Sequence, residues 1–428
     1  MIINQLFNYL VDYSKILIFT LAIFFWDLGL ENIDTRLFIF LLLLYIFDYK
    51  ILISKPYKKT ILYCFLVFVI LCIHYYFNLI IDKDNYFFIS KNLIYIFFSF
   101  LVILLNLEFL RKNLRWIIFS FVLIFLTFTA IFFFINGYDQ EFDLSCTYTG
   151  GWHGYTRYLF SENSHFGMIS VAVVLYYSIG VELKNISLPE KFCFFIFLIV
   201  AVINYSALFL VAIILSLIAL IISNFKEYKL QSIFFSFILM VTSLYFVFSD
   251  FDCRYKIFQP QSAVIQTFTK DFVKEENKNP IEKKDDLRLG MSGAVFVNSI
   301  NIAKTSIMDR PFGWGLDRYE FAYNKYAVKE REKYRLQSYH DRLFDWNLNS
   351  KDGSNNLAKI ITEFGFFSIF LFVFFVYFSF SKKATLEEKS FLIPLILTQL
   401  LRGAGYYNGG FLLCIILMLF ISFLKRYD

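Results

Sequence analysis

Polar residues of the types used in chemistry gather in four segments of an otherwise apolar chain. The first segment, residues 150–168, carries Arg157, Glu162 and His165 and leads directly into an apolar stretch. Charged side chains are costly to hold beside lipid, so this grouping at the start of a membrane span favours a functional site. An interfacial loop whose long polar side chains reach water is the alternative interpretation.

Two further segments combine arginine with glycine. Residues 309–316 hold Arg310 beside a proline and two glycines, which predicts a tight backbone turn. Residues 402–410 hold Arg402 and Tyr406 between the last two apolar stretches. An isolated arginine at the outer end of a span requires a negative partner. A lipid headgroup would serve as that partner, and so would a phosphorylated substrate.

The remaining segment places Ser354, Asn355 and Asn356 at the expected start of a helix. Serine and asparagine are favoured as helix N-caps, so capping alone would explain Ser354. Capping does not explain Lys359 and Glu363, which follow in the first turns of an apolar stretch. Their spacing of four residues would let them pair with each other.

Composition excludes several classes of protein. Hydrophobic residues make up 58% of the 428 residues and charged residues only 18%, whereas soluble domains are about half apolar and a quarter charged. No G-x-x-x-x-G-K-S/T motif and no helix-opening GxGxxG is present, and the four histidines and six cysteines lack zinc spacing. We therefore expect a membrane protein without a metal or cofactor. Membrane topology accounts for the net charge of +6, so nucleic acid is not an expected partner.

The apolar stretches predict an all-α polytopic membrane protein with about twelve transmembrane helices, since a helix of about 20 apolar residues crosses the hydrocarbon core. They cover residues 15–31, 36–54, 61–81, 88–107, 116–136, 165–182, 192–205, 207–223, 231–249, 356–380, 390–402 and 409–424. Lysine and arginine concentrate in alternate loops, which places both termini in the cytoplasm. This assignment requires a hairpin at 204–206 rather than one long helix over 192–223.

One large periplasmic loop, residues 250–355, separates a first bundle (1–249) from the last three spans (356–428). Within the loop, 270–288 is polar and lacks periodicity, which predicts a linker. Residues 291–308 have helical apolar spacing, which predicts a short helix lying on the membrane surface or capping a cavity.

A smaller periplasmic loop, residues 137–164, carries Cys146, and Cys253 lies near the start of the large loop. Both cysteines are expected on the oxidising side of the membrane. The sequence leaves open whether they pair.

Together the four segments resemble the Wzy-type O-antigen polymerases, within the superfamily that also includes O-antigen ligases. The resemblance rests on Arg157 with SENSHFGM (161–168), RPFGWG (310–315), DGSNN (352–356) with EFG (363–365), and RGAGY (402–406). Their order and the long loop before the tenth span also match. Ligases usually carry a His-Asn pair where this chain has Ser354-Asn355 or Asn355-Asn356, and this departure favours the polymerase branch.

The resemblance implies transfer of a growing glycan from undecaprenyl diphosphate onto a second lipid-linked repeat unit, at the periplasmic face of the bacterial inner membrane. No metal or cofactor is implied. The partners it implies are the lipid-linked glycans, membrane lipids, a chain-length regulator and a flippase. A flippase for the same lipid-linked units and an O-antigen ligase are the alternative functions. A secondary ion-coupled transporter is a third, disfavoured because the spans lack acids and repeats.

The resemblance also suggests roles for individual residues. Two arginines, Arg157 and Arg402, would bind the diphosphate, and Arg288 or Arg310 from the large loop would assist them. The acceptor hydroxyl would be oriented or deprotonated by Glu162 or His165. The residues expected to contact substrate oxygens or the sugar are Ser354, Asn355, Asn356 and Tyr406.

Overall fold

The computed structural model describes twelve stretches of the chain, namely residues 2–24, 58–81, 91–136, 163–203, 207–224, 230–248, 291–333, 350–351, 353, 355–403, 405–406 and 410–423. Within these residues the regular elements are all helices and no strand occurs, which confirms the all-α prediction.

The helices of the first bundle overlap the expected apolar stretches, although α1 and α5 begin 13 and nine residues earlier than expected. They are α1 (Ile2–Phe24), α3 (Lys58–Ile81), α4 (Lys91–Leu105), α5 (Leu107–Asn136), α7 (Asn163–Leu175), the π-helix η3 (Tyr176–Gly180), η4 (Leu183–Asn185), α8 (Leu188–Ile203), α9 (Ala207–Asn224) and α10 (Leu230–Phe248). The stretch expected at 36–54 lies outside the described residues, and so does the hairpin expected at 204–206.

The remaining elements come from the large loop and the C-terminal part. They are α12 (Met291–Asp309), α13 (Tyr319–Lys333), α15 (Asn356–Phe364), η8 (Gly365–Phe367), α16 (Ser368–Phe380), α17 (Leu386–Leu401) and α18 (Phe411–Phe423). The helix expected at 291–308 is therefore confirmed as α12. The linker expected at 270–288 lies outside the described residues.

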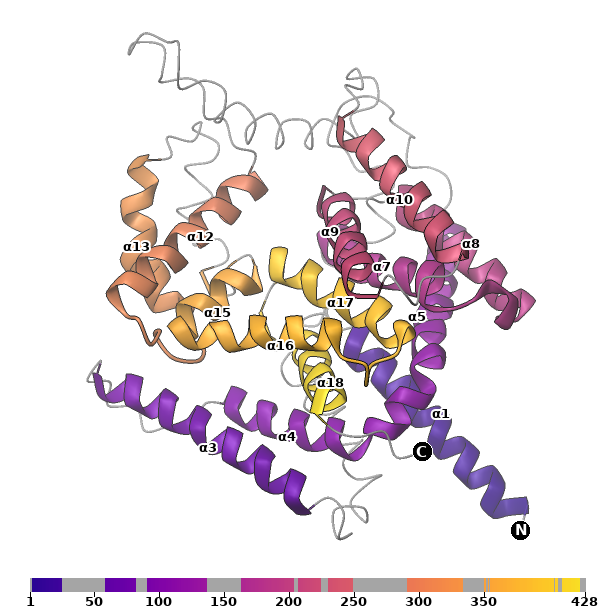
Figure 1. Cartoon of the computed structure of the whole chain (residues 1–428), viewed down its shortest axis with the longest axis horizontal. Helices are drawn as coiled ribbons and strands as arrows, with labels where there is room; N and C mark the ends of the chain where they lie inside the picture. The colour runs from indigo at the N-terminus through magenta and orange to yellow at the C-terminus, as the bar shows by residue number, and fades with distance from the viewer. Residues whose placement is uncertain are drawn as a thin grey trace.

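Helix α17 occupies the centre of the molecule and packs against α7, α9 and η3 (Figure 1). Thr385 and Glu388 start this helix with a capping box, in which each side chain bonds the other residue's backbone amide. Aromatic side chains fill the space around it. The rings of Phe125 and Phe166 stack at 4.8 Å, and those of Phe24 and Phe121 at 4.4 Å. The resulting core holds α7 and α17 side by side along their lengths.

A second, smaller core lies under α12 and α13, which pack on α15 at one side of the molecule (Figure 1). Its members are Ile302, Trp314, Tyr319, Ala322, Tyr323, Tyr326 and Ala327. Through α12 and α13 the large loop packs on α15, the helix that begins at the expected site residue Asn356 and is capped by Asn355.

Among the described residues, two helical stretches are long and apolar enough to cross a membrane, Leu107–Ile131 and Asn356–Phe380. Shorter apolar helices of the described part include His165–Gly180, Phe209–Asn224 and Phe411–Phe423. Large apolar side chains such as Phe370 and Phe380 are exposed along α16, which is the arrangement expected where lipid surrounds a helix.

Candidate functional site

The glycine-rich turn after α12 is hydrogen-bonded to the end of α15. The amide of Trp314 donates to the carbonyl of Thr362 at 3.0 Å, and that of Gly315 donates to the carbonyl of Glu363 at 2.9 Å. The contact requires a residue without a side chain, since a Cβ on Gly313 would lie 2.2 Å from the carbonyl oxygen of Glu363. At this position φ is +81°, which also favours glycine. The glycine-rich segment 309–316 therefore meets the segment that runs from Ser354 to Glu363.

The side chain of Glu363 connects these two segments to residues 402–410. Its carboxylate is fully buried, and the Tyr406 hydroxyl donates to Oε2 at 2.5 Å. The backbone amide of Tyr319 donates to Oε1 at 3.3 Å, and Lys359 Nζ lies 3.5 Å from the same oxygen. The pairing of Lys359 with Glu363 is thus confirmed. We call Lys359, Glu363 and Tyr406, with the amide of Tyr319, the Glu363 cluster.

Lys359 completes the Glu363 cluster and is itself buried. Its ammonium group donates to the carbonyl of Lys351 at 2.7 Å and lies 5.2 Å from the centre of the Tyr406 ring. A buried ammonium group needs such compensation, because burial removes its hydration. The cluster therefore ties α15 to residues before it and to the loop between α17 and α18.

The two asparagines are fully buried and bond to the protein itself. Asn355 caps α15, because its Oδ1 accepts from the amide of Ala358 at 2.7 Å, and its Nδ2 donates to Ser299 Oγ at 2.6 Å. Asn356 Oδ1 accepts from the amide of Gly405 at 3.1 Å. Within the described residues, Nδ2 of Asn356 has no hydrogen-bond partner. In this structure Asn355 joins the start of α15 to α12, and Asn356 positions the loop that contains Gly405.

Arg402 directly follows the last residue of α17 and is half-buried. Its amide donates to the carbonyl of Thr398, whose hydroxyl in turn donates to the carbonyl of Met168 at 2.9 Å. His165 is buried in the first turn of α7. The start of α7 therefore lies beside the end of α17, so the described part of the first segment lies on the same side of the molecule as Arg402.

Arg310 stacks on the indole of Trp314, with the guanidinium carbon 3.8 Å from the ring centre. The neighbouring carboxylate of Asp309 accepts from Lys325 Nζ at 2.6 Å and from the Tyr326 hydroxyl. These two donors hold the pKa of Asp309 below its ordinary value. A guanidinium that is stacked on a ring in this way keeps its N–H groups in one plane, as bidentate binding of an anion requires.

The other expected site residues lie outside the described residues, namely Arg157, Glu162, Arg288 and Ser354, and so do Cys146 and Cys253. Of the expected residues that the structure describes, Asn355, Asn356 and Tyr406 are brought together around α15. The residue that sequence reasoning left out of the site is Glu363. A carboxylate within an apolar stretch was the available signal, since such a group is rare unless it has a function or a partner.

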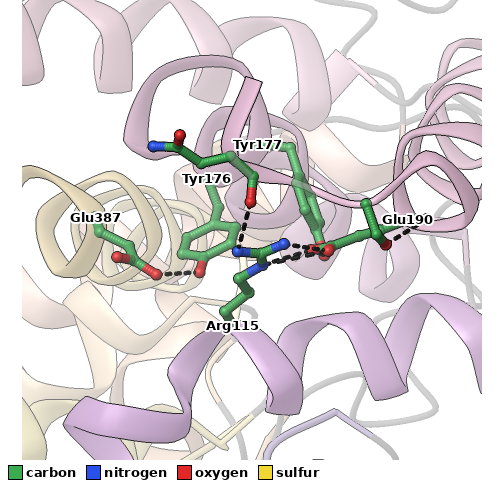
Figure 2. Close-up of polar contacts among 7 residues, drawn as sticks. Arg115, Tyr176, Tyr177, Glu190 and Glu387 are labelled. Atoms are coloured by element: carbon green, nitrogen blue, oxygen red, sulfur yellow. Dashed lines mark hydrogen bonds and ion pairs between the residues drawn. The ribbon is translucent and has the colours of Figure 1, made fainter. Parts of the chain in front are cut away.

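A second polar cluster lies at the opposite ends of α7 and α17 (Figure 2). Arg115 forms a bidentate pair with Glu190, with bonds of 2.5–3.2 Å, and Tyr177 donates to the same carboxylate at 3.1 Å. The neighbouring Tyr176 donates to Glu387 at the start of α17. We call these five residues the Arg115 cluster. The π-helix η3 presents both tyrosines, and their rings meet edge to face.

Among the described residues, no group of three histidine, cysteine, aspartate or glutamate side chains lies close enough to hold a metal ion. The side chains around α15 include arginine, lysine, tyrosine, asparagine and the carboxylate of Glu363. A scan against protein-family models, a search of curated proteins and a search of solved structures each found no match to this chain.

Proposed function

We propose that this protein polymerises glycan repeat units carried on undecaprenyl diphosphate. The growing glycan would be transferred from its lipid diphosphate to a hydroxyl of a second lipid-linked unit, and undecaprenyl diphosphate would leave. The proposal includes about twelve spans, both termini in the cytoplasm, and a reaction at the periplasmic face of the inner membrane.

The observation that carries the proposal is the meeting of three separate polar segments at α15. The sequence marks these segments by their polar residues and glycines, and together they resemble those of O-antigen polymerases. In the structure, Gly315 bonds the backbone of Glu363, and Tyr406 bonds its side chain. Segments that form one site must come together, and these three do.

The chemistry of the reaction fits the groups around this meeting point. The leaving group is a diphosphate, and guanidinium groups bind phosphate oxygens through paired N–H donors. Arg310 stacks on Trp314, in the turn that bonds the end of α15, and Arg402 precedes Gly405, whose amide bonds Asn356 of α15. Arginines at these positions would stabilise the negative charge that develops on the leaving diphosphate. We include Arg157 and Arg288 as further phosphate ligands, and Glu162 or His165 as the group that orients or deprotonates the acceptor hydroxyl.

Within this proposal Tyr406 remains a substrate contact together with Asn355 and Asn356, whereas Glu363 positions other groups and does not touch the substrate. Every described contact of its carboxylate is to the protein, and the side chain is fully buried. Its effect on catalysis would be to fix the loop that begins at Arg402. Misplacement of a binding group by about 1 Å can lower a rate roughly 100-fold.

Deletion of the gene tests the proposal against its two rivals. Loss of a polymerase should leave a single repeat unit attached to lipid A, because flipping and ligation continue. Loss of a flippase or a ligase should remove all glycan from lipid A. Complementation with the wild-type gene should restore the ladder of long chains, and a deletion strain without any glycan would overturn the proposal.

A further inference from the structure

The membrane-length stretch that begins at Asn356 is divided at Gly365. Before the division, α15 buries its polar residues, among them Lys359, Thr362 and Glu363. After it, α16 is apolar, and Ile369, Phe370, Val373, Val376, Tyr377 and Phe380 are exposed along it. The 3-10 turn η8 separates the two parts. Protein therefore surrounds α15, whereas only α16 presents a continuous apolar face to the surroundings.

Helix α16 alone is too short to cross a bilayer. Its 13 residues span roughly 20 Å, whereas the hydrocarbon core is about 30 Å thick. The apolar face must therefore extend beyond the start of α16. It does so through Phe366 and Phe367, which are exposed by 61% and 48%.

The turn after α12 continues the same face. The side chain of Phe312 is 58% exposed, and its ring lies 5.9 Å from that of Phe367. Met308, in the last turn of α12, is 76% exposed. A backbone hydrogen bond fixes the turn beside the residues that precede α16, because the amide of Phe366 donates to the carbonyl of Pro311 at 2.8 Å.

Several backbone groups of this turn bond within the protein. Segments in hydrocarbon must satisfy their N–H and C=O groups within the protein. Pro311 has no N–H, and the carbonyl of Phe312 accepts from His74 Nε2 at 2.9 Å. The amide of Gly313 donates to the carbonyl of Arg310 at 2.9 Å, and the amides of Trp314 and Gly315 donate to the end of α15. A turn exposed to water would not need a histidine from a distant helix for this purpose.

We propose that Met308 and Phe312 insert into the acyl chains of the bilayer, at the depth of Phe366 and Phe367, and anchor the large loop to the membrane. The inference rests on the membrane location in the proposed function, but not on the reaction. Arg310 and Trp314 fit this placement, because stacked arginine and tryptophan side chains suit the boundary between acyl chains and headgroups. The anchor would fix the depth in the bilayer of the turn that bonds the backbone of Glu363.

Site-directed spin labelling in lipid nanodiscs tests this inference. Single labels replace Met308, Phe312, Ile369 or Lys304 in the full-length protein, after substitution of its native cysteines. Ile369 is the reference for lipid, and Lys304, exposed on the same helix as Met308, is the reference for water. The accessibility of each label to oxygen, which concentrates in lipid, is compared with its accessibility to a water-soluble nickel chelate.

We expect the ratio of oxygen to nickel accessibility at 308 and 312 to match that at 369 and to exceed that at 304 several-fold. A ratio like that of 304 would place the turn in water and overturn the inference. Low accessibility to both reagents would indicate cover by protein, such as a second copy, and would also overturn it. If the label at 312 prevents folding, quenching of Phe312→Trp fluorescence by brominated lipids gives the same answer. Polymerase activity does not enter the measurement, so the two proposals fail separately.

Discussion

The Arg115 cluster lies at the start of α17, whereas the Glu363 cluster lies where α15 meets the loop after α17, and the two differ in how they are built. In the Arg115 cluster, side chains from helices pair with one another, and Glu190 is held by both Arg115 and Tyr177 (Figure 2). In the Glu363 cluster, the carboxylate is held by a loop tyrosine and a backbone amide, and glycines with positive φ bring the loops close. The first arrangement fastens helices, whereas the second fixes loops that carry exposed or half-buried arginines.

This difference predicts different consequences of damage. Changes in the Arg115 cluster should lower the amount of folded protein without altering the activity of each molecule. Changes in the Glu363 cluster should lower the activity of each molecule as well. The activity is the glycan polymerisation proposed above, so each variant requires both a stability measurement and a polymerisation assay.

The largest effect is expected for Glu363→Ala. This change leaves the buried Lys359 without its carboxylate and removes the acceptor of the Tyr406 hydroxyl. Breaking a buried charge pair from one side costs about 3–5 kcal/mol. Thermal unfolding in detergent should show this loss, and polymerisation should disappear.

The double variant Lys359→Met/Glu363→Gln is the matched control, since it removes both charges and keeps similar volumes. It should recover most of the lost stability but little of the activity. If activity returns together with stability, the Glu363 cluster serves only to hold the fold.

Arg115→Ala should have the next largest effect. The carboxylate of Glu190 is 2% exposed and would keep Tyr177 as its side-chain partner. The expected loss is about 2–3 kcal/mol, below that of a fully buried pair because the Arg115 side chain is 29% exposed. Membrane extracts should contain less folded protein, whereas activity per molecule should stay near wild type. Lys112→Ala, an exposed change on the same helix, should alter neither quantity.

A glycine-to-alanine substitution near each cluster compares the two clusters directly. In Gly403→Ala, the new Cβ would lie 2.4 Å from Asn356 Nδ2 and must shift the loop behind Arg402. We expect activity per molecule to fall roughly 100-fold through this misplacement. In Gly180→Ala, the Cβ would meet Ser390 Oγ at 2.0 Å near the Arg115 cluster. Stability should fall there without a change in activity per molecule, and equal losses of activity would remove the distinction.

The smallest effect is expected at Asp309. Its pKa is lowered by Lys325 and Tyr326, so the stabilisation is present above the ordinary aspartate pKa and is lost as pH falls through the lowered value. Because the pair is exposed, it contributes less than about 1 kcal/mol. Hydrogen exchange of α13 should be insensitive to this pair near neutral pH and should lose protection below about pH 4. Lys325→Ala should weaken that dependence, and an unchanged profile would contradict the assignment.

The sequence was informative wherever a single local rule decides the structure. Apolar stretches predicted most of the described helices but not the polar helix α13, and the glycine-rich segment around Arg310 forms the expected turn. The meeting of this turn with Glu363 could not be predicted, because it depends on backbone bonds between residues about 50 positions apart. The role of Asn355 as the cap in place of Ser354, and the bond from His74 to the turn, likewise depend on how remote segments pack.

The most direct test of the proposed function uses purified protein in liposomes that contain the lipid-linked repeat unit of its own glycan. Wild-type protein should produce longer glycans and release undecaprenyl diphosphate. Arg402→Lys, at equal thermal stability, should lose most of this product, because lysine keeps the charge but lacks the planar pair of N–H donors. Long glycans from Arg402→Lys at the wild-type rate would contradict the role of Arg402 in binding the diphosphate. Failure of the wild-type protein to extend its authentic lipid-linked unit would contradict the proposed function itself.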